Sequence, residues 1–151
     1  MSRRDARPPS PSGEEGQTMI LVIGYVVIAL LTISAMLAAT AVNLEARRLL
    51  SVADGAATAA ADDFSLDPSA EDVSLRLSDA AVESTVRGYL TDTRAAARFR
   101  GLGIGAAEAH GDGTTAYVRL TAVADPPIVG WFVPGGVPIT VESSSRSVLS
   151  R

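Results

Sequence analysis

Residues 101–106 (GLGIGA) match, in letters, the Gly-x-Gly-x-x-Gly/Ala fingerprint that binds the diphosphate of a dinucleotide. That chemistry depends on context, because the glycines must follow a strand and open a helix whose N-terminus meets the diphosphate. Here a helical pattern precedes the glycines and strand patterns follow them. We therefore predict that this segment binds no nucleotide.

The other residues that could do chemistry are the single histidine, His110, and five acids near the middle of the chain. No Gly-x-Ser-x-Gly elbow and no Ser/Asp constellation accompanies His110, so we interpret it as a turn residue. The spacing of the acids does not match a calcium-binding loop, and we interpret them as solvated charge beside a helix. The five acids are Asp62, Asp63, Asp67, Glu71 and Asp72.

Composition removes further classes of function. Without cysteine and with one histidine, the chain cannot build a disulfide, a thiol active site, a Cys-based metal centre or a two-histidine metal site. All 13 basic residues are Arg, against 17 acids, which gives a net charge of −4. No run of Arg forms a patch for nucleic-acid phosphates. We predict no enzyme activity, no cofactor, no metal, no small-molecule substrate and no nucleic-acid partner.

A membrane-type segment dominates the N-terminal half. Met19–Val42 contains 20 apolar residues among 24, and no charged residue. A helix of this length spans about 36 Å, enough to cross a hydrocarbon core of about 30 Å. Residues 1–18 are rich in Pro, Ser and Gly and cannot bury enough apolar surface to become ordered. The sequence predicts a disordered cytoplasmic tail over 1–18 and a transmembrane helix over 19–42, with the lipid bilayer as a partner.

Processing and orientation of this segment stay open. Residues 39–41 (ATA) satisfy the small-x-small rule, so a signal peptide cleaved after Ala41 is the alternative to a retained anchor. The apolar core is longer than that of most signal peptides, and a long polar tail precedes it, which favours the anchor. Three Arg precede the segment and two follow it, which slightly favours a cytoplasmic N-terminus.

The helical pattern continues beyond the membrane segment. Residues 43–61 contain no Pro and are dominated by strong helix formers, so we predict an Ala-rich helix extension there. One face of this extension carries small residues at three- and four-residue spacing, and a second small face lies inside the membrane segment. Such faces allow another surface to approach closely, although abundant Ala alone would also produce them. The predicted interaction residues are Ser34, Ala38 and Ala41, followed by Ala53, Ala56, Ala57 and Ala60.

Residues 62–151 are predicted to form an extracytoplasmic α+β domain. Residues 73–77 alternate like a short strand, and Ser78 is typical of an N-cap for a helix that runs to about Phe99. Residues 115–124 and 137–149 alternate with period two, and the turn at 110–114 predicts a hairpin. The expected fold is a helix packed on a small antiparallel sheet of three or four strands.

An apolar loop over 126–136 contains the only Trp of the chain. Two interpretations stay open, because loops normally lie on the surface. Trp131 and Phe132 either fold back to cap a lean core, or they contact the bilayer interface or a partner protein.

The order of these parts resembles the TadE/TadG-like proteins of the tight-adherence (Flp) pilus-assembly system. Residues 15–18 (EGQT) lead straight into the apolar helix. Residues 47–61 (RRLLSVADGAATAAA) are similar to the family's Arg-rich and then Ala-Asp-Ala-Ala-rich helix extension. The C-terminal strand, the apolar Pro/Gly loop and the Ser/Thr-rich last strand complete the resemblance, which covers residues 13–61 and, more loosely, 115–149.

The resemblance implies a bitopic, pilin-like protein of the inner membrane whose C-terminal domain lies outside the cytoplasm. Such a protein acts as a minor pilin-like or scaffolding subunit in the assembly of an adhesive pilus, and its partners are pilus-assembly or pilin subunits contacted through the helix. Family members can carry a prepilin-type signal, with cleavage after a Gly and a Glu five residues on. Gly16 matches the first element, and Leu21 stands where the Glu would be.

Overall fold

The computed structural model describes residues 14–63, 77–111, 113–126, 130 and 134–146. The chain forms two compact units, Met1–Leu37 and Ala38–Arg151. The predicted disorder of residues 1–13 and the predicted strand over 73–76 lie outside the described residues.

The described part of the first unit is helical. Helix α1 (Glu14–Asp63) contributes residues 14–37 to it, so residues 14–18 of the predicted disordered tail belong to the helix. Large apolar side chains on this stretch are exposed, among them Ile20 at 74% and Leu21 at 70%. Among the described residues, α1 is the one helix that is long and apolar enough to cross a membrane.

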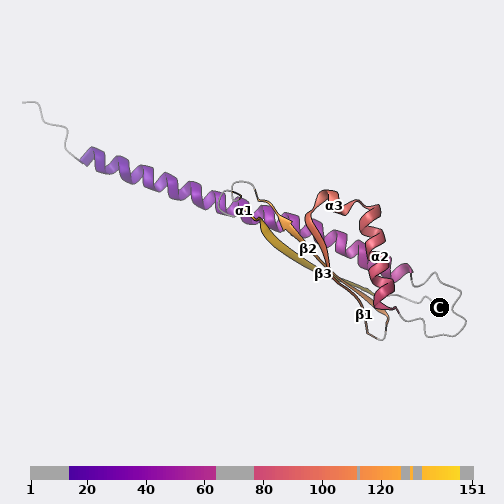
Figure 1. Cartoon of the computed structure of the whole chain (residues 1–151). Coiled ribbons are helices and arrows are strands. Elements are labelled where there is room, and N and C mark those ends of the chain that lie inside the picture. The colour runs from indigo at the N-terminus through magenta and orange to yellow at the C-terminus, as the bar shows by residue number, and fades with distance from the viewer. Residues whose placement is uncertain (1–13, 64–76, 112, 127–129, 131–133, 147–151) are drawn as a thin grey trace, which may run out of the picture. The chain divides into compact units, whose positions relative to one another are not determined.

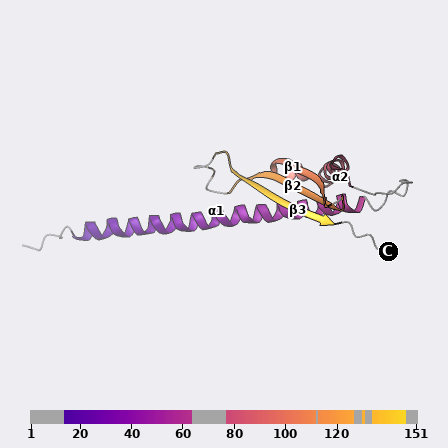
Figure 2. The same ribbon diagram turned by 90° about the horizontal axis from the view of Figure 1, so that it is seen from below.

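The second unit contains the rest of α1 and all other elements. Two shorter helices, α2 (Asp79–Asp92) and α3 (Ala95–Arg98), precede the strands β1 (Arg100–His110), β2 (Thr115–Ala124) and β3 (Val137–Arg146). The described strands form one antiparallel sheet in the order β1-β2-β3 (Figure 1). Figure 2 shows the sheet alongside the second half of α1, with α2 close to the end of that helix. The predicted α+β fold with a small antiparallel sheet is confirmed.

The core of this unit forms where the Ala-rich face of α1 meets one face of the sheet. Alternate residues of β2, including Val118 and Leu120, are fully buried, as the period-two pattern predicts. Leu49 of α1 and Val82 and Val86 of α2 join the same apolar cluster. Fully burying a Leu or Val side chain contributes about 1.5–3 kcal/mol, so these few larger residues provide much of the stability.

Helix α2 begins as predicted and ends earlier than predicted. Ser78 is its N-cap, and the Ser78 hydroxyl accepts a hydrogen bond from the Ala81 N–H at 3.2 Å. The helix stops at Asp92, because Arg94 adopts the left-handed conformation, with φ of 51°. The single predicted helix to Phe99 is therefore two helices, α2 and the short α3. Helices commonly end at such a left-handed residue, which is usually Gly. Because the residue here is Arg, the sequence does not predict that the helix ends at this point.

The turn between β1 and β2 confirms the predicted hairpin. Gly111 and Gly113 both have positive φ, at 62° and 75°, a conformation that favours glycine. The outer edge of β1 is partly closed from the α2 side, since the Ala109 N–H donates to Asp79 Oδ1 at 2.8 Å. This contact fixes the start of α2 against the sheet and removes one free donor from the strand edge.

Candidate functional site

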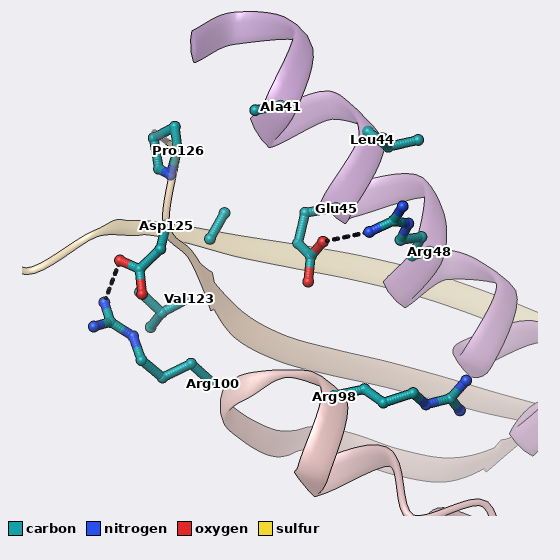
Figure 3. A pocket seen from close by; sticks show the side chains of 10 residues that line it. Ala41, Leu44, Glu45, Arg48, Arg98, Arg100, Val123, Asp125 and Pro126 are labelled. Carbon is teal, nitrogen blue, oxygen red and sulfur yellow. Dashed lines mark ion pairs between the residues drawn. The ribbon is translucent and has the colours of Figure 1, made fainter. Parts of the chain in front are cut away.

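A polar cavity of about 320 Å³ lies between the beginning of the second unit's helix and one end of its sheet. Its charged residues define what we name the arginine groove (Figure 3). A second cavity of about 660 Å³ shares three of them and adds Ser51 and Tyr89. The arginine groove comprises Glu45, Arg48, Arg98, Arg100 and Asp125.

Three elements, α1, α3 and β1, position four of these side chains, and the fifth, Asp125, directly follows β2. Glu45 and Arg48 are three residues apart on α1, so they share one face of the helix. Arg98 is the last residue of α3 and Arg100 the first of β1. Phe99, between them, is only 6% exposed. Because Phe99 is anchored in the core and the chain is extended there, its two Arg neighbours are exposed beside the cavity.

The acids of the groove neutralise its arginines unequally. Arg100 Nη2 lies 2.9 Å from Asp125 Oδ1 and also donates to the Gly135 carbonyl at 2.9 Å. Arg48 Nη1 is 3.6 Å from Glu45 Oε2, a looser pair, and the Arg48 side chain is 64% exposed. Figure 3 shows Arg98 directed toward neither acid. Exposed ion pairs contribute only about 0–1 kcal/mol, so the Arg48 guanidinium can exchange its partner for another anion at little cost.

Arg98 is the least neutralised cation of the groove. Among the described residues it makes no ion pair within 4.0 Å, and its Nη2 contacts only the Thr93 carbonyl, at 3.5 Å. Arg47, on the neighbouring side of α1, donates through Nε to Asn43 Oδ1 at 2.9 Å. The three Arg of the groove against its two acids leave +1, in a chain whose net charge is −4.

The sequence alone does not indicate this concentration of charge. It contains no run of Arg at the groove, because the fold brings together residues that lie about 50 or more positions apart. In the sequence, Arg47 and Arg48 flank the apolar segment and begin the Arg-rich stretch of the resemblance, and no local pattern connects them with Arg98 and Arg100. The one available signal is the Arg-x-Arg pattern around a buried aromatic residue, which places both cations on the surface.

The Ala-rich surface predicted to bind a partner is covered by the chain itself. Ala53, Ala56, Ala57 and Ala60 are between 0% and 2% exposed and belong to the core. Their small side chains do allow close approach of another surface, as predicted, and that surface is the chain's own sheet and α2. These four residues therefore form no surface for another protein.

The remaining predicted site residues lie elsewhere. Gly16 is exposed on α1, and Ser34 is half-buried in the first unit. Ala38, at 9% exposure, and the half-buried Ala41 belong to the second unit, where Ala41 lines the arginine groove. Trp131 and Phe132 lie outside the described residues, so both interpretations of their loop stay open.

The residues that first suggested chemistry are not brought together. Residues 101–106 lie within strand β1, which continues to His110, whereas a dinucleotide site requires a helix directly after these glycines. His110 Nε2 is 3.5 Å from Glu108 Oε2, and its ring meets the Tyr117 ring edge-on at 5.1 Å. Asp63 Oδ2 accepts a hydrogen bond from the Thr85 hydroxyl. In the part of the chain that the structure describes, no three His, Asp or Glu side chains gather as a metal site would require.

The outer face of the sheet carries one further polar cluster. The Arg119 guanidinium lies 2.8 Å from Glu142 Oε1 and donates to the Tyr117 hydroxyl at 3.0 Å. The hydrogen bond that Arg119 donates to Tyr117, and then the charge of Glu142, raise the pKa of Arg119 above its ordinary value. A Cβ at Gly105 would lie 3.2 Å from Arg119 Cγ, so the glycine leaves room for this side chain. The Arg119–Glu142 ion pair of this cluster cross-links the neighbouring strands β2 and β3.

No protein-family model, curated protein or solved structure matches the chain.

Proposed function

We propose that this chain is a membrane-anchored, non-enzymatic subunit in the assembly of a tight-adherence-type adhesive pilus. One observation carries the anchoring part. Residues 19–37 of α1 expose large apolar side chains, whereas residues 49–61 of the same helix are built into the core of an α+β unit. The pilus-assembly part is supported by the order of sequence parts that resembles the TadE/TadG-like proteins.

The exposed apolar stretch needs an apolar environment. Ile20, Leu21 and Leu31 are 74%, 70% and 59% exposed. Leaving such a side chain in water forgoes about 1.5–3 kcal/mol each, and contiguous apolar surface of this extent marks contact with a membrane or a partner. A helix satisfies its own backbone hydrogen bonds, so this stretch can be surrounded by lipid. In our proposal the anchor lies in the inner membrane and the second unit lies outside the cytoplasm.

The proposed mechanism is association. Ser34 presents a small side chain on the membrane segment, where small residues permit close packing of helices. The partners would be helices of pilin or pilus-assembly subunits. Of the two open interpretations of the loop around Trp131, contact with a partner is the one that this mechanism would use.

A secreted binding domain is the second candidate. Every residue of the main core cluster, from Leu49 onward, follows the predicted cleavage point after Ala41. A chain cut there would lose the anchor and keep that core. Intact-mass measurement of the mature protein from its source cells separates the two candidates, because retention of residues 19–41 excludes release.

The pilus role is tested by complementation. Source cells that lack the gene should lose assembled pili, and the full chain should restore them. As the matched variant, residues 1–41 are replaced by an unrelated cleavable signal peptide, which exports the second unit without its anchor. We expect this variant to be exported and to fail to restore pili. Full restoration by the unanchored variant would show that the anchor is not required, and unchanged pili in the deletion strain would refute the pilus assignment.

A further inference from the structure

We propose that the arginine groove binds the phosphodiester headgroup of an anionic phospholipid, with Arg48 and Arg98 as its ligands. This inference rests on the proposed membrane anchor, because the lipid belongs to the bilayer that surrounds residues 19–42. It adds a defined lipid-binding site to a chain whose anchor alone would require only an apolar environment.

The position of the groove along α1 is the first argument. The predicted span ends at Val42, and a helix rises 1.5 Å per residue. Glu45 therefore lies about 4–5 Å, and Arg48 about 9 Å, beyond the end of the span along the helix axis. The polar layer on each side of a hydrocarbon core is about 5–8 Å thick. Glu45 and Arg48, the two groove residues on α1, thus lie at the depth of the headgroups or directly above it.

The chemistry of the lining is the second argument. The end of the groove nearest the span is apolar, with Ala41, Leu44 and Pro126, and Leu44 is 49% exposed. Arg48 follows Leu44 by four residues on α1, and Figure 3 shows Arg98 at the part of the groove away from Ala41. This order matches a phospholipid, whose glycerol and acyl portions point into the membrane and whose phosphate lies outward. A cavity of about 320 Å³ is of the size that small ligands occupy.

The charges of the groove favour an anionic lipid over a zwitterionic one. Three Arg against Glu45 and Asp125 leave +1, and Asp125 is already engaged by Arg100 at 2.9 Å. Arg98 is free of carboxylates within the described residues, and the Arg48–Glu45 contact is 3.6 Å long. Guanidinium groups bind phosphate oxygens through paired, charge-assisted hydrogen bonds, which suits a phosphodiester monoanion. Phosphatidylglycerol has this headgroup with no compensating positive charge.

The test is native mass spectrometry of the full chain in detergent micelles, titrated with phosphatidylglycerol or phosphatidylcholine. We expect one phosphatidylglycerol to bind, at least about tenfold more tightly than phosphatidylcholine. A hydrogen bond to a charged group contributes enough that Arg98→Gln should weaken phosphatidylglycerol binding about tenfold, and Arg48→Gln with Arg98→Gln about a hundredfold. Both side chains are exposed, so the fold should survive, which the thermal unfolding of each variant checks.

Arg146→Gln is the matched control. It removes the same charge from the opposite end of the sheet, where Arg146 pairs with Thr115. We expect it to leave phosphatidylglycerol binding unchanged. An equal loss with Arg146→Gln would overturn the site, because net charge alone would then explain the affinity. Equal binding of the two lipids by the unaltered chain would also overturn it.

Two further measurements separate the sources of failure. Glycerol 3-phosphate is added as a free competitor, and displacement at concentrations equal to the lipid's would assign the groove to soluble phosphate compounds and overturn the lipid assignment. Resistance of the chain to alkaline extraction from membranes tests the anchor independently. An anchored chain without lipid preference refutes this inference alone, whereas an extractable chain refutes the proposed function.

Discussion

The contact between Gly55 of α1 and Tyr89 of α2 offers a sharp test of how the second unit is packed. Gly55 lies inside a long helix, where replacement by Ala would normally stabilise the protein by about 0.8–1.0 kcal/mol. In this structure a Cβ at position 55 would lie 2.7 Å from Tyr89 Cζ and 3.3 Å from Cε1. The two effects have opposite signs, so the outcome depends on which is larger.

We expect the cost of overpacking to be larger than the gain in helix propensity. Overfilling a packed contact costs about 1–3 kcal/mol, and Tyr89 is half-buried against the core, so its ring cannot move freely into solvent. Subtracting the gain in helix propensity leaves Gly55→Ala destabilised by about 1 kcal/mol. In a chain that also carries Tyr89→Leu, the obstructing end of the ring is gone, and the same Gly55→Ala change should stabilise by about 0.8–1.0 kcal/mol. The expected coupling between the two positions is therefore about 2 kcal/mol.

The assay is urea unfolding of the full chain in detergent micelles, with the folded fraction measured by pulse proteolysis. Gly88→Ala is the matched control, because Gly88 lies inside α2, is exposed, and a Cβ there would meet nothing within 4 Å. It should stabilise by about 0.8–1.0 kcal/mol. The reasoning fails if Gly55→Ala stabilises as much as the control does. It fails equally if Gly55→Ala destabilises to the same extent with Leu at position 89.

Three further changes test other parts of the second unit by the same unfolding assay. Ser78→Ala removes the hydroxyl that caps α2 and should cost about 1 kcal/mol, whereas Ser78→Asp should retain most of the stability; equal losses would show that the cap does not contribute. Leu120→Ala empties a fully buried site between the sheet and the helices and should cost about 2–5 kcal/mol; a loss below about 1 kcal/mol would contradict its place in the core. Gly136→Ala places a Cβ at a residue with φ of 73° and 2.6 Å from Val123 Cγ1, so it should cost at least about 1 kcal/mol, and a neutral result would contradict that geometry.

The parts of the fold that follow from periodicity could be predicted from the sequence. The three- and four-residue spacing on α1 identified a face that is buried, from Leu49 to Ala60, and the alternation over 115–124 identified the inward side of β2. These patterns depend only on which side of an element is removed from water, so a single sequence contains them. The N-cap at Ser78 was predictable for a similar reason, because it involves only neighbouring residues.

The parts that depend on contacts between distant segments could not be predicted. The sequence indicated that the Ala face of α1 would be approached closely, and it did not indicate that the chain's own sheet would cover it. Arg98 and Arg100 line the same cavity as Arg48 because α2 ends at Asp92, Arg94 adopts the left-handed conformation, and the chain then turns back into β1. No local sequence signal predicts that an Arg adopts the left-handed conformation. The arginine groove therefore cannot be predicted from the sequence alone.

The small side chains of α1 explain how a core with few large apolar residues can stabilise this unit. An Ala side chain buries little apolar area, so the gain in stability per residue is small at Ala53, Ala56 and Ala57. What these residues provide is proximity, because without branched side chains the helix and its neighbours can approach until the larger residues Leu49 and Leu120 are fully enclosed. A larger residue in the Ala face would separate the layers and open the space around those enclosed side chains. The tolerance of α1 for substitution therefore differs along one helix: at Ala53, Ala56 and Ala57 small size is the property that the fold requires, whereas the large apolar side chains between residues 19 and 37 are exposed and are not enclosed by the rest of the chain.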